Sequence, residues 1–141
     1  MKETLILDSG LQRNDFKIHC IKFVRNFLAQ NDISIQENTF CMLVNEICKN
    51  IWDHASGKGE ISLELKQFGL FFEIKDHGTG KYNLETVRKQ GSSLKGNGIN
   101  RGFGICGGMI QSTADILSVT DFKINTDCGF KYSGTTPLTQ E

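Results

Sequence analysis

The sequence predicts an α+β fold, a two-layer sandwich in which a mixed, mostly antiparallel sheet is covered by helices on one face. Two segments near the N-terminus carry apolar residues at helical spacing, and later segments alternate in polarity as strands do. At 141 residues, the chain has the length of one domain and buries about two-thirds of its unfolded surface on folding. We therefore expect one domain over residues 1–141, with a flexible tail from about residue 135.

The first elements are a strand and a helix. The stretch "ETLILDS" is typical of a short strand. In "RNDFKIHCIKFVRNFLAQND", apolar residues recur at helical spacing and predict an amphipathic helix. The residues of this apolar stripe are Ile18, Ile21, Val24 and Leu28.

The next helix contains "NEICKNIWDHA", residues 45–55, and follows the turn "DISIQENTF". At 100° per residue, its apolar residues fall within an arc of about 120°. They are Phe40, Cys41, Val44, Ile47, Cys48, Ile51 and Ala55. Glu46, Asn50 and Asp53 fall on the far side, with His54 at the edge of that group. The glycines of "SGKG" then end the helix.

The second half of the chain begins with a hairpin, in which "EISLELKQ" and "GLFFEIKD" are strands joined at "QFG". A long glycine-rich loop, residues 76–101, comes next, and loops of this length are usually functional. "GFGICGGMIQSTAD" predicts a third helix. "ILSVTD" and "FKYSGT" predict two further strands around a loop at "KINTDC", with Pro137 in a polar tail.

Composition excludes several classes of protein. Lys plus Arg and Asp plus Glu both number 16, so the zero net charge favours neither nucleic acid nor an anionic membrane as partner. No apolar run approaches the roughly 20 residues that span a bilayer, and "MKETLILDSG" is unlike a secretory signal. The five cysteines form no C-x-x-C pair. We expect a cytoplasmic protein with free thiols, whose buried cysteines act as small hydrophobes.

The first motif is Glu46-x-x-x-Asn50, with His54 one turn further on. Taken alone, it fits a solvated helix face. It also fits a general base with a metal ligand one turn away, since a carboxylate accepts protons and an amide oxygen suits Mg²⁺. Asn is a poor helix former, so the position of Asn50 in the middle of a helix requires an explanation.

The second motif is "DHGTG", in which Asp76, Gly78 and Gly80 follow a predicted strand. Asp and Gly are also common in ordinary turns. The functional reading is recognition of a nucleobase. An ionised Asp accepts a hydrogen bond from an exocyclic amine, and glycines let the backbone approach a flat ring.

The third motif is "GSSLKGNGINRGFGICGG". Its glycines permit a flexible lid, and Gly102-x-Gly104 opens the predicted third helix, where backbone N–H groups favour phosphate. Lys95 and Arg101 add positive charge. The segment does not match a dinucleotide-binding fingerprint, because no βαβ unit surrounds it, and the Walker lysine motif is absent.

The order and spacing of these motifs resemble the GHKL ATPase superfamily of gyrase, a heat-shock chaperone class, histidine kinases and MutL. The resemblance spans about residues 16–133 and implies a Bergerat-type ATP-binding fold. Within this superfamily, "FVRNFL" and "LVNEICKNIWDHA" look most like the small stand-alone serine kinases that act as anti-sigma factors or switch kinases. Histidine kinases usually carry Asn where Glu46 stands.

The resemblance implies a role for each motif. Asp76 contacts the adenine amino group, with Gly78 and Gly80 under the base, and Asn50 binds Mg²⁺. Glu46 activates the hydroxyl of a partner's serine or threonine. Gly102 and Gly104 let the lid and helix start fold against the phosphates, and His54 either approaches the phosphates or has a capping or packing role. Lys95 and Arg101 are further candidates because of their positive charge, since lid residues 92–101 align only loosely with the family. One departure is Phe130, which stands where the family often has a threonine that supports the adenine pocket.

The leading hypothesis is thus an Mg·ATP-dependent serine/threonine protein kinase that phosphorylates and binds a small regulatory protein, such as an anti-sigma antagonist or a sigma factor. One alternative is a non-catalytic module whose nucleotide sets the shape of a partner-binding surface. Another is a detached histidine-kinase ATPase domain. Pairing through "ETLILDS", as in family members, makes a homodimer a further expectation.

Overall fold

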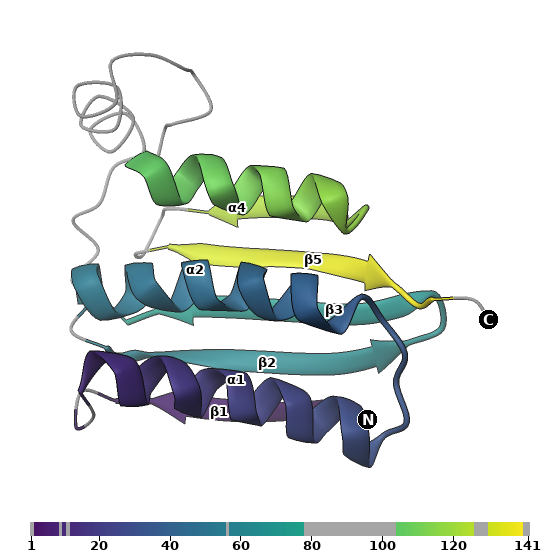
Figure 1. Cartoon of the computed structure of the whole chain (residues 1–141), viewed down its shortest axis with the longest axis horizontal. Helices are drawn as coiled ribbons and strands as arrows, with labels where there is room; N and C mark the ends of the chain where they lie inside the picture. The colour runs from purple at the N-terminus through teal and green to yellow at the C-terminus, as the bar shows by residue number, and fades with distance from the viewer. Residues whose placement is uncertain are drawn as a thin grey trace.

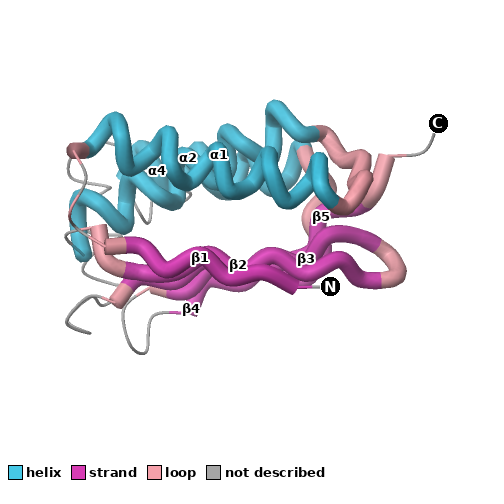
Figure 2. Tube along the Cα trace, turned by 90° about the horizontal axis from the view of Figure 1, so that it is seen from below, coloured by secondary structure: helices cyan, strands magenta, loops and turns pink. Residues whose placement is uncertain are grey.

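The computed structural model describes residues 2–8, 10, 12–55, 57–77, 104–125 and 130–139. The elements are β1 (Lys2–Leu7), α1 (Arg13–Gln30), α2 (Glu37–Ala55), β2 (Gly59–Lys66), β3 (Gly69–Asp76), α4 (Gly104–Ile116), β4 (Thr120–Asn125) and β5 (Lys131–Pro137). The three helices lie side by side over one face of the sheet (Figures 1 and 2). The predicted α+β class, with helices on one face of a sheet, is confirmed.

The sheet has five strands in the order β1-β2-β3-β5-β4. The prediction of a mixed sheet is wrong, because every pairing among the described strands is antiparallel. Antiparallel sheets tolerate one solvated face, and here none of the described helices covers the second face of the sheet (Figure 2). The predicted hairpin is confirmed, since Lys66 pairs with Gly69 across a two-residue turn.

Two predicted boundaries after the third helix are wrong. Helix α4 continues through Ile116, and β4 runs from Thr120 to Asn125, so β4 includes half of the predicted "KINTDC" loop.

Strand β5 reaches Pro137, which pairs with Gly69 on β3. The tail therefore cannot begin at residue 135. Proline is tolerated there because β4 pairs with β5 only as far as Thr135, so residue 137 has β3 alone as a neighbour among the described strands.

Helix α1 buries a different stripe from the predicted one. Its fully or almost fully buried apolar residues are Phe16, Cys20, Val24, Phe27 and Leu28. Val24 and Leu28 were predicted correctly, but Ile18 is 56% exposed and Ile21 is only partly buried. The sequence of α1 carries two apolar stripes, and the one with the larger aromatic side chains packs against the sheet because it removes more apolar area from water.

Three cysteines lie in the core beneath the helices. Cys20, Cys41 and Cys48 are free and buried, which confirms the prediction for the α2 cysteines. Burial raises the pKa of the Cys41 thiol. A hydrogen bond with Cys20, together with burial, raises the pKa of Cys48 well above its usual value. Since the thiolate is the reactive form, Cys41 and Cys48 act as packing groups.

Candidate functional site

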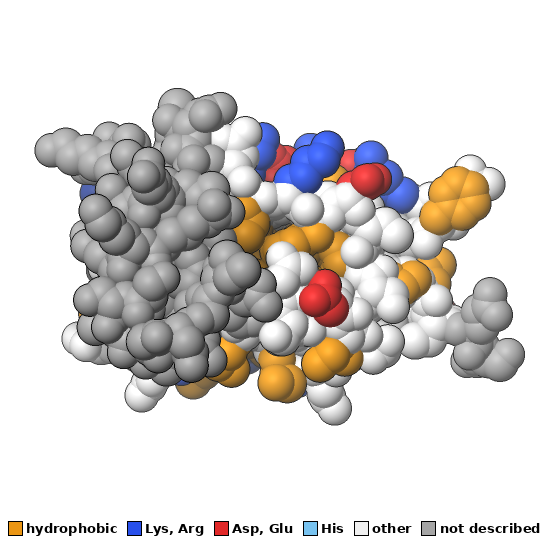
Figure 3. All heavy atoms as spheres, turned by 90° about the horizontal axis from the view of Figure 1, so that it is seen from above, with side chains coloured by type: hydrophobic (Ala, Val, Ile, Leu, Met, Phe, Trp, Pro, Cys, Tyr) orange, Lys and Arg blue, Asp and Glu red, His pale blue; other side chains and the backbone are white. Residues whose placement is uncertain are grey.

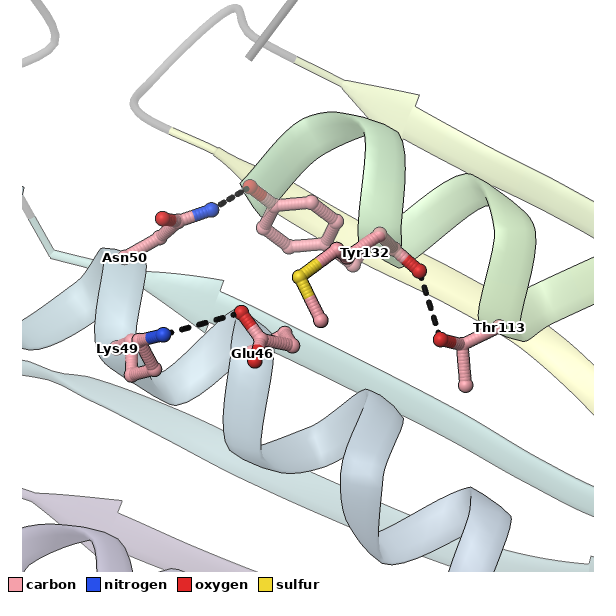
Figure 4. A network of polar contacts seen from close by, with 6 residues as sticks. Glu46, Lys49, Asn50, Thr113 and Tyr132 are labelled. Carbon is pink, nitrogen blue, oxygen red and sulfur yellow. Dashed lines mark hydrogen bonds and ion pairs between the residues drawn. The ribbon is translucent and has the colours of Figure 1, made fainter. Parts of the chain in front are cut away.

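Helix α2 is the middle helix of its layer, and its polar row is buried. Glu46 is 8% exposed and Asn50 is 7% exposed, although both lie outside the predicted apolar arc. Helix α2 packs against α4, and the side chains of Glu46 and Asn50 point from α2 toward α4 and β5 (Figure 4). Leu43, one turn before Glu46, is fully buried and extends the apolar surface toward this side. The interpretation of this row as a solvated face is therefore wrong for Glu46 and Asn50, but Asp53 is exposed.

Asn50 contacts the sheet through a tyrosine that sequence analysis did not single out. Its side-chain Nδ2 donates a hydrogen bond of 3.3 Å to the hydroxyl of Tyr132 on β5 (Figure 4). Alternate residues of β5 are buried, which directs Tyr132 toward the helices. With the amide nitrogen engaged, the Oδ1 oxygen of Asn50 points away from Tyr132 and is the atom suited to a hard cation.

Glu46 lies one turn before Asn50 on the same helix. Its Oε2 oxygen accepts a hydrogen bond of 3.3 Å from Lys49 Nζ, an ion pair within α2 (Figure 4). The contact engages one of the two carboxylate oxygens, so the other is the candidate acceptor for a substrate proton. The site thus has a buried carboxylate and a buried amide at consecutive turns.

Asp76 is the last residue of β3 and is 4% exposed. Its backbone N–H donates a 2.9 Å hydrogen bond to the carbonyl of Phe130, directly before β5. On its other side it pairs with Gly59, where an added Cβ would lie 2.3 Å from the carbonyl oxygen of Lys75. Asp76 is therefore held between two strands whose backbones leave no room for a side chain at residue 59.

The predicted residues meet through β5. Phe130 binds the Asp76 backbone, and its ring stacks on that of Tyr132 with centroids 6.1 Å apart. Tyr132 in turn accepts the hydrogen bond from Asn50. The ends of α2 and β3 and the starts of α4 and β5 all lie at this end of the molecule (Figure 1). Two motifs that are separate in sequence are thereby joined by contacts.

Several predicted site residues lie outside the described residues, namely Gly78, Gly80, Lys95, Arg101 and Gly102. The side chain of His54 is also outside them, although its backbone belongs to α2. Gly104 is the first residue of α4, as the predicted helix start requires. Tyr132 is the residue that sequence reasoning missed. The alternation of "FKYSGT" was the signal that it shares the inner face of its strand.

The donor set can be compared with the needs of Mg²⁺. Among the described residues, no three His, Cys, Asp or Glu side chains are gathered to hold a metal. Nucleotide-bound Mg²⁺ does not require such a cage, because it keeps several waters and takes phosphate oxygens as ligands. One neutral oxygen from Asn50 therefore fits this ion.

The face shown in Figure 3 carries mixed charge. On the face in Figure 3, Lys and Arg side chains stand beside Asp and Glu side chains instead of forming one basic patch. None of the helices in the described part of the chain combines the length and apolarity needed to cross a bilayer.

Comparisons of the sequence with protein-family models and with curated proteins found no match.

Proposed function

We propose that the chain binds Mg·ATP in a Bergerat-type fold and transfers the γ-phosphoryl group to a serine or threonine of a small regulatory protein, as anti-sigma and switch kinases do. The observation that carries the proposal is the chain of contacts from Asp76 through Phe130 and Tyr132 to Asn50. It joins the candidate base-recognition residue to the candidate metal ligand. The ends of α2 and β3 and the starts of α4 and β5 lie at the same end of the molecule (Figure 1).

In this proposal, nucleotide recognition begins at the end of β3. The Asp76 carboxylate accepts a hydrogen bond from the adenine amino group, and Gly78 and Gly80 lie under the base. The Asn50 oxygen holds Mg²⁺, which neutralises charge on the phosphates when it is bound. The phosphates rest against the start of α4 at Gly104, where backbone N–H groups are available. Gly102, Lys95, Arg101 and His54 complete the phosphate contacts.

Glu46 is the proposed catalytic residue. Its carboxylate takes the proton from the partner's hydroxyl as that oxygen bonds to the γ-phosphorus and the bond to the β-phosphate oxygen breaks, releasing ADP. The ion pair with Lys49 holds one carboxylate oxygen, which restricts the rotation of the side chain. Lys49 is thus a positioning residue in this scheme.

Nucleotide binding is tested by calorimetry with ATP and ADP, with and without Mg²⁺. Asp76→Asn should weaken binding of both nucleotides by about tenfold or more, because an amide NH₂ replaces an acceptor oxygen. Asn50→Ala should remove the Mg²⁺-dependent part of the affinity. Asp53→Asn is the matched control, since Asp53 is an exposed acid on the same helix. If calorimetry detects no heat of binding for either nucleotide, the proposal is overturned.

Phosphoryl transfer is tested with γ-labelled ATP and the products of neighbouring genes, each assayed singly. Glu46→Gln should abolish acid-stable labelling of the partner while leaving ATP affinity unchanged, and Asp53→Asn should leave both unchanged. Labelling that persists in Glu46→Gln would refute the role of Glu46. Acid-labile label on a partner histidine would instead identify a detached histidine-kinase ATPase domain.

A non-catalytic nucleotide-binding module is the second candidate, and Phe130 favours it. The family often has a threonine at this position, and here an almost fully buried phenylalanine stacks on Tyr132. Such a module binds Mg·ATP but transfers no phosphoryl group to any partner. Its affinity for the partner differs between the ATP-bound and the ADP-bound state. That combination of results would replace the kinase proposal.

A further inference from the structure

A groove of about 540 Å³ lies between the outer surfaces of α1 and α2. The residues that line it are Asn14, Lys17, Ile18, Ile21, Lys22, Arg25 and Asn45. Asn45 belongs to α2 and shares the groove with residues of α1, whereas Asn50 on the same helix bonds to β5. None of the described residues that line the groove belongs to the candidate nucleotide site, so an inference about the groove does not depend on the proposed function.

The apolar residues that line the groove belong to the stripe of α1 that the core leaves unused. Ile18 is 56% exposed and Ile21 is half-buried, while the opposite stripe of α1 packs against the sheet. Met42, one turn before Asn45 on α2, is also exposed. The α1 residues of the groove recur at intervals of three and four along the helix, so they form a straight strip. Exposed apolar side chains arranged in a concave strip are typical of a protein-binding surface.

The lining of the groove also carries positive charge. Of its described lining residues, Lys17, Lys22 and Arg25 are basic and none is acidic. Arg25 is paired with Glu37, but Lys17 and Lys22 have no ion-pair partner among the described residues. In a chain with zero net charge, this is a local excess of positive charge. An occupant with acidic side chains beside its apolar stripe would complement it.

We propose that this groove binds an amphipathic helix of a partner protein, with apolar residues facing Ile18 and Ile21 and acidic residues facing Lys17 and Lys22. From residue 14 to residue 25, the strip is about 16 Å long, which matches about three turns of a helix. Helices that bind in such grooves use anchors at spacings of three, four and seven. A flat membrane surface fits less well, because the apolar residues lie in a concavity between two helices.

The test uses a synthetic helical peptide with leucines at positions i, i+4 and i+7 and glutamates on both flanks. Added to isotopically labelled protein, it should shift the backbone amide signals of the groove residues. Ile18→Asp should weaken peptide affinity about tenfold or more, because it removes a central apolar anchor. The matched control is Ile116→Asp, which changes an isoleucine that is 65% exposed on α4 and should leave the affinity unchanged.

Charge is tested separately. A peptide with lysines in place of the glutamates should bind about tenfold more weakly, and the combined Lys17→Glu and Lys22→Glu variant should reverse this preference. Equal binding of both peptides, or binding unaffected by Ile18→Asp, would overturn the proposal. So would a homodimer in solution that Ile18→Asp dissociates, or Ile18-dependent binding to phosphatidylserine vesicles in preference to the peptide. Asn50→Ala should leave peptide binding unchanged, which separates this surface from the nucleotide site.

Discussion

The side-chain amide of Asn50 on α2 donates a hydrogen bond to the hydroxyl of Tyr132 on β5, across 82 residues of sequence. Both residues are buried, so the bond joins the middle helix to the sheet away from water. Because the amide donates through its nitrogen, its oxygen is turned away from the sheet. This contact leaves the oxygen of Asn50 as the atom available to the proposed Mg²⁺.

Replacing Tyr132 by Phe should lower the free energy of unfolding by about 1–2 kcal/mol, since the buried amide of Asn50 loses its acceptor. The released amide should also lose its fixed orientation, so the Mg²⁺-dependent part of ATP affinity should fall. A double-mutant cycle with Asn50→Ala, followed by urea unfolding, should give a coupling free energy of roughly 0.5–1.5 kcal/mol. A coupling free energy near zero would show that this hydrogen bond adds nothing to stability.

Gly59→Ala should disturb Asp76 as well as the fold. The added Cβ would lie 2.3 Å from the Lys75 carbonyl oxygen and 3.1 Å from the Asp76 Cα, so the strands must move apart. We expect a loss of about 1–3 kcal/mol in unfolding free energy and weaker ATP binding. Gly69→Ala is the matched control, because its Cβ would lie 2.4 Å from the Thr136 carbonyl oxygen at the far end of the hairpin. It should lose stability but keep the ATP affinity of its folded fraction.

The ion pair between Glu60 and Lys75 should make stability depend on pH. Lys75 Nζ lies 2.9 Å from Glu60 Oε1, and this hydrogen bond lowers the pKa of Glu60 below its ordinary value of 4.5. A lowered acid pKa stabilises the fold above about pH 4.5, and the contribution is lost as pH falls through the folded-state pKa. The same bond raises the pKa of Lys75, so its contribution is lost as pH rises through that pKa.

Glu60→Gln should therefore lower the unfolding free energy by about 0.2–1 kcal/mol at neutral pH, the range for partly exposed pairs. Urea unfolding should show this difference shrinking toward zero in acid and in high salt. Glu64→Gln is the matched control, since Glu64 lies on the same face of β2 and has no ion-pair partner among the described residues. Equal pH profiles for the two variants would contradict the prediction.

Thr136→Val should stabilise the protein. Thr136 is buried on β5, and its hydroxyl oxygen has no hydrogen-bond partner among the described residues. Replacing the hydroxyl by a methyl group removes the cost of burying it, and we expect about 1–2 kcal/mol of added unfolding free energy by urea titration. Thr135→Val, at a partly exposed neighbouring position, controls for the strand preference of valine. If Thr136→Val adds no more unfolding free energy than Thr135→Val, the Thr136 hydroxyl is hydrogen-bonded in the folded protein.

The kinds of element and most of their limits could be predicted from the sequence, because they depend on local patterns. Apolar periodicity predicts α1 and α2, and alternation around a short turn predicts the β2–β3 hairpin. Glu46, Asn50 and Asp76 could also be selected as candidate site residues from their chemistry and spacing. The end of α4 was misplaced because "ILSV" carries an apolar pattern that fits either a helix end or a strand.

Only the tertiary structure decided which of these residues are buried and which meet. Packing of α4 against one side of α2 buries Glu46 and Asn50, and the choice between two apolar stripes on α1 leaves Ile18 outside. The placement of β5 between β3 and β4 brings Phe130 to Asp76 and Tyr132 to Asn50. Local patterns cannot predict such contacts, because they depend on how distant elements share one core. The polar row on α2 could be identified from the sequence, but its burial depends on the elements that pack against α2.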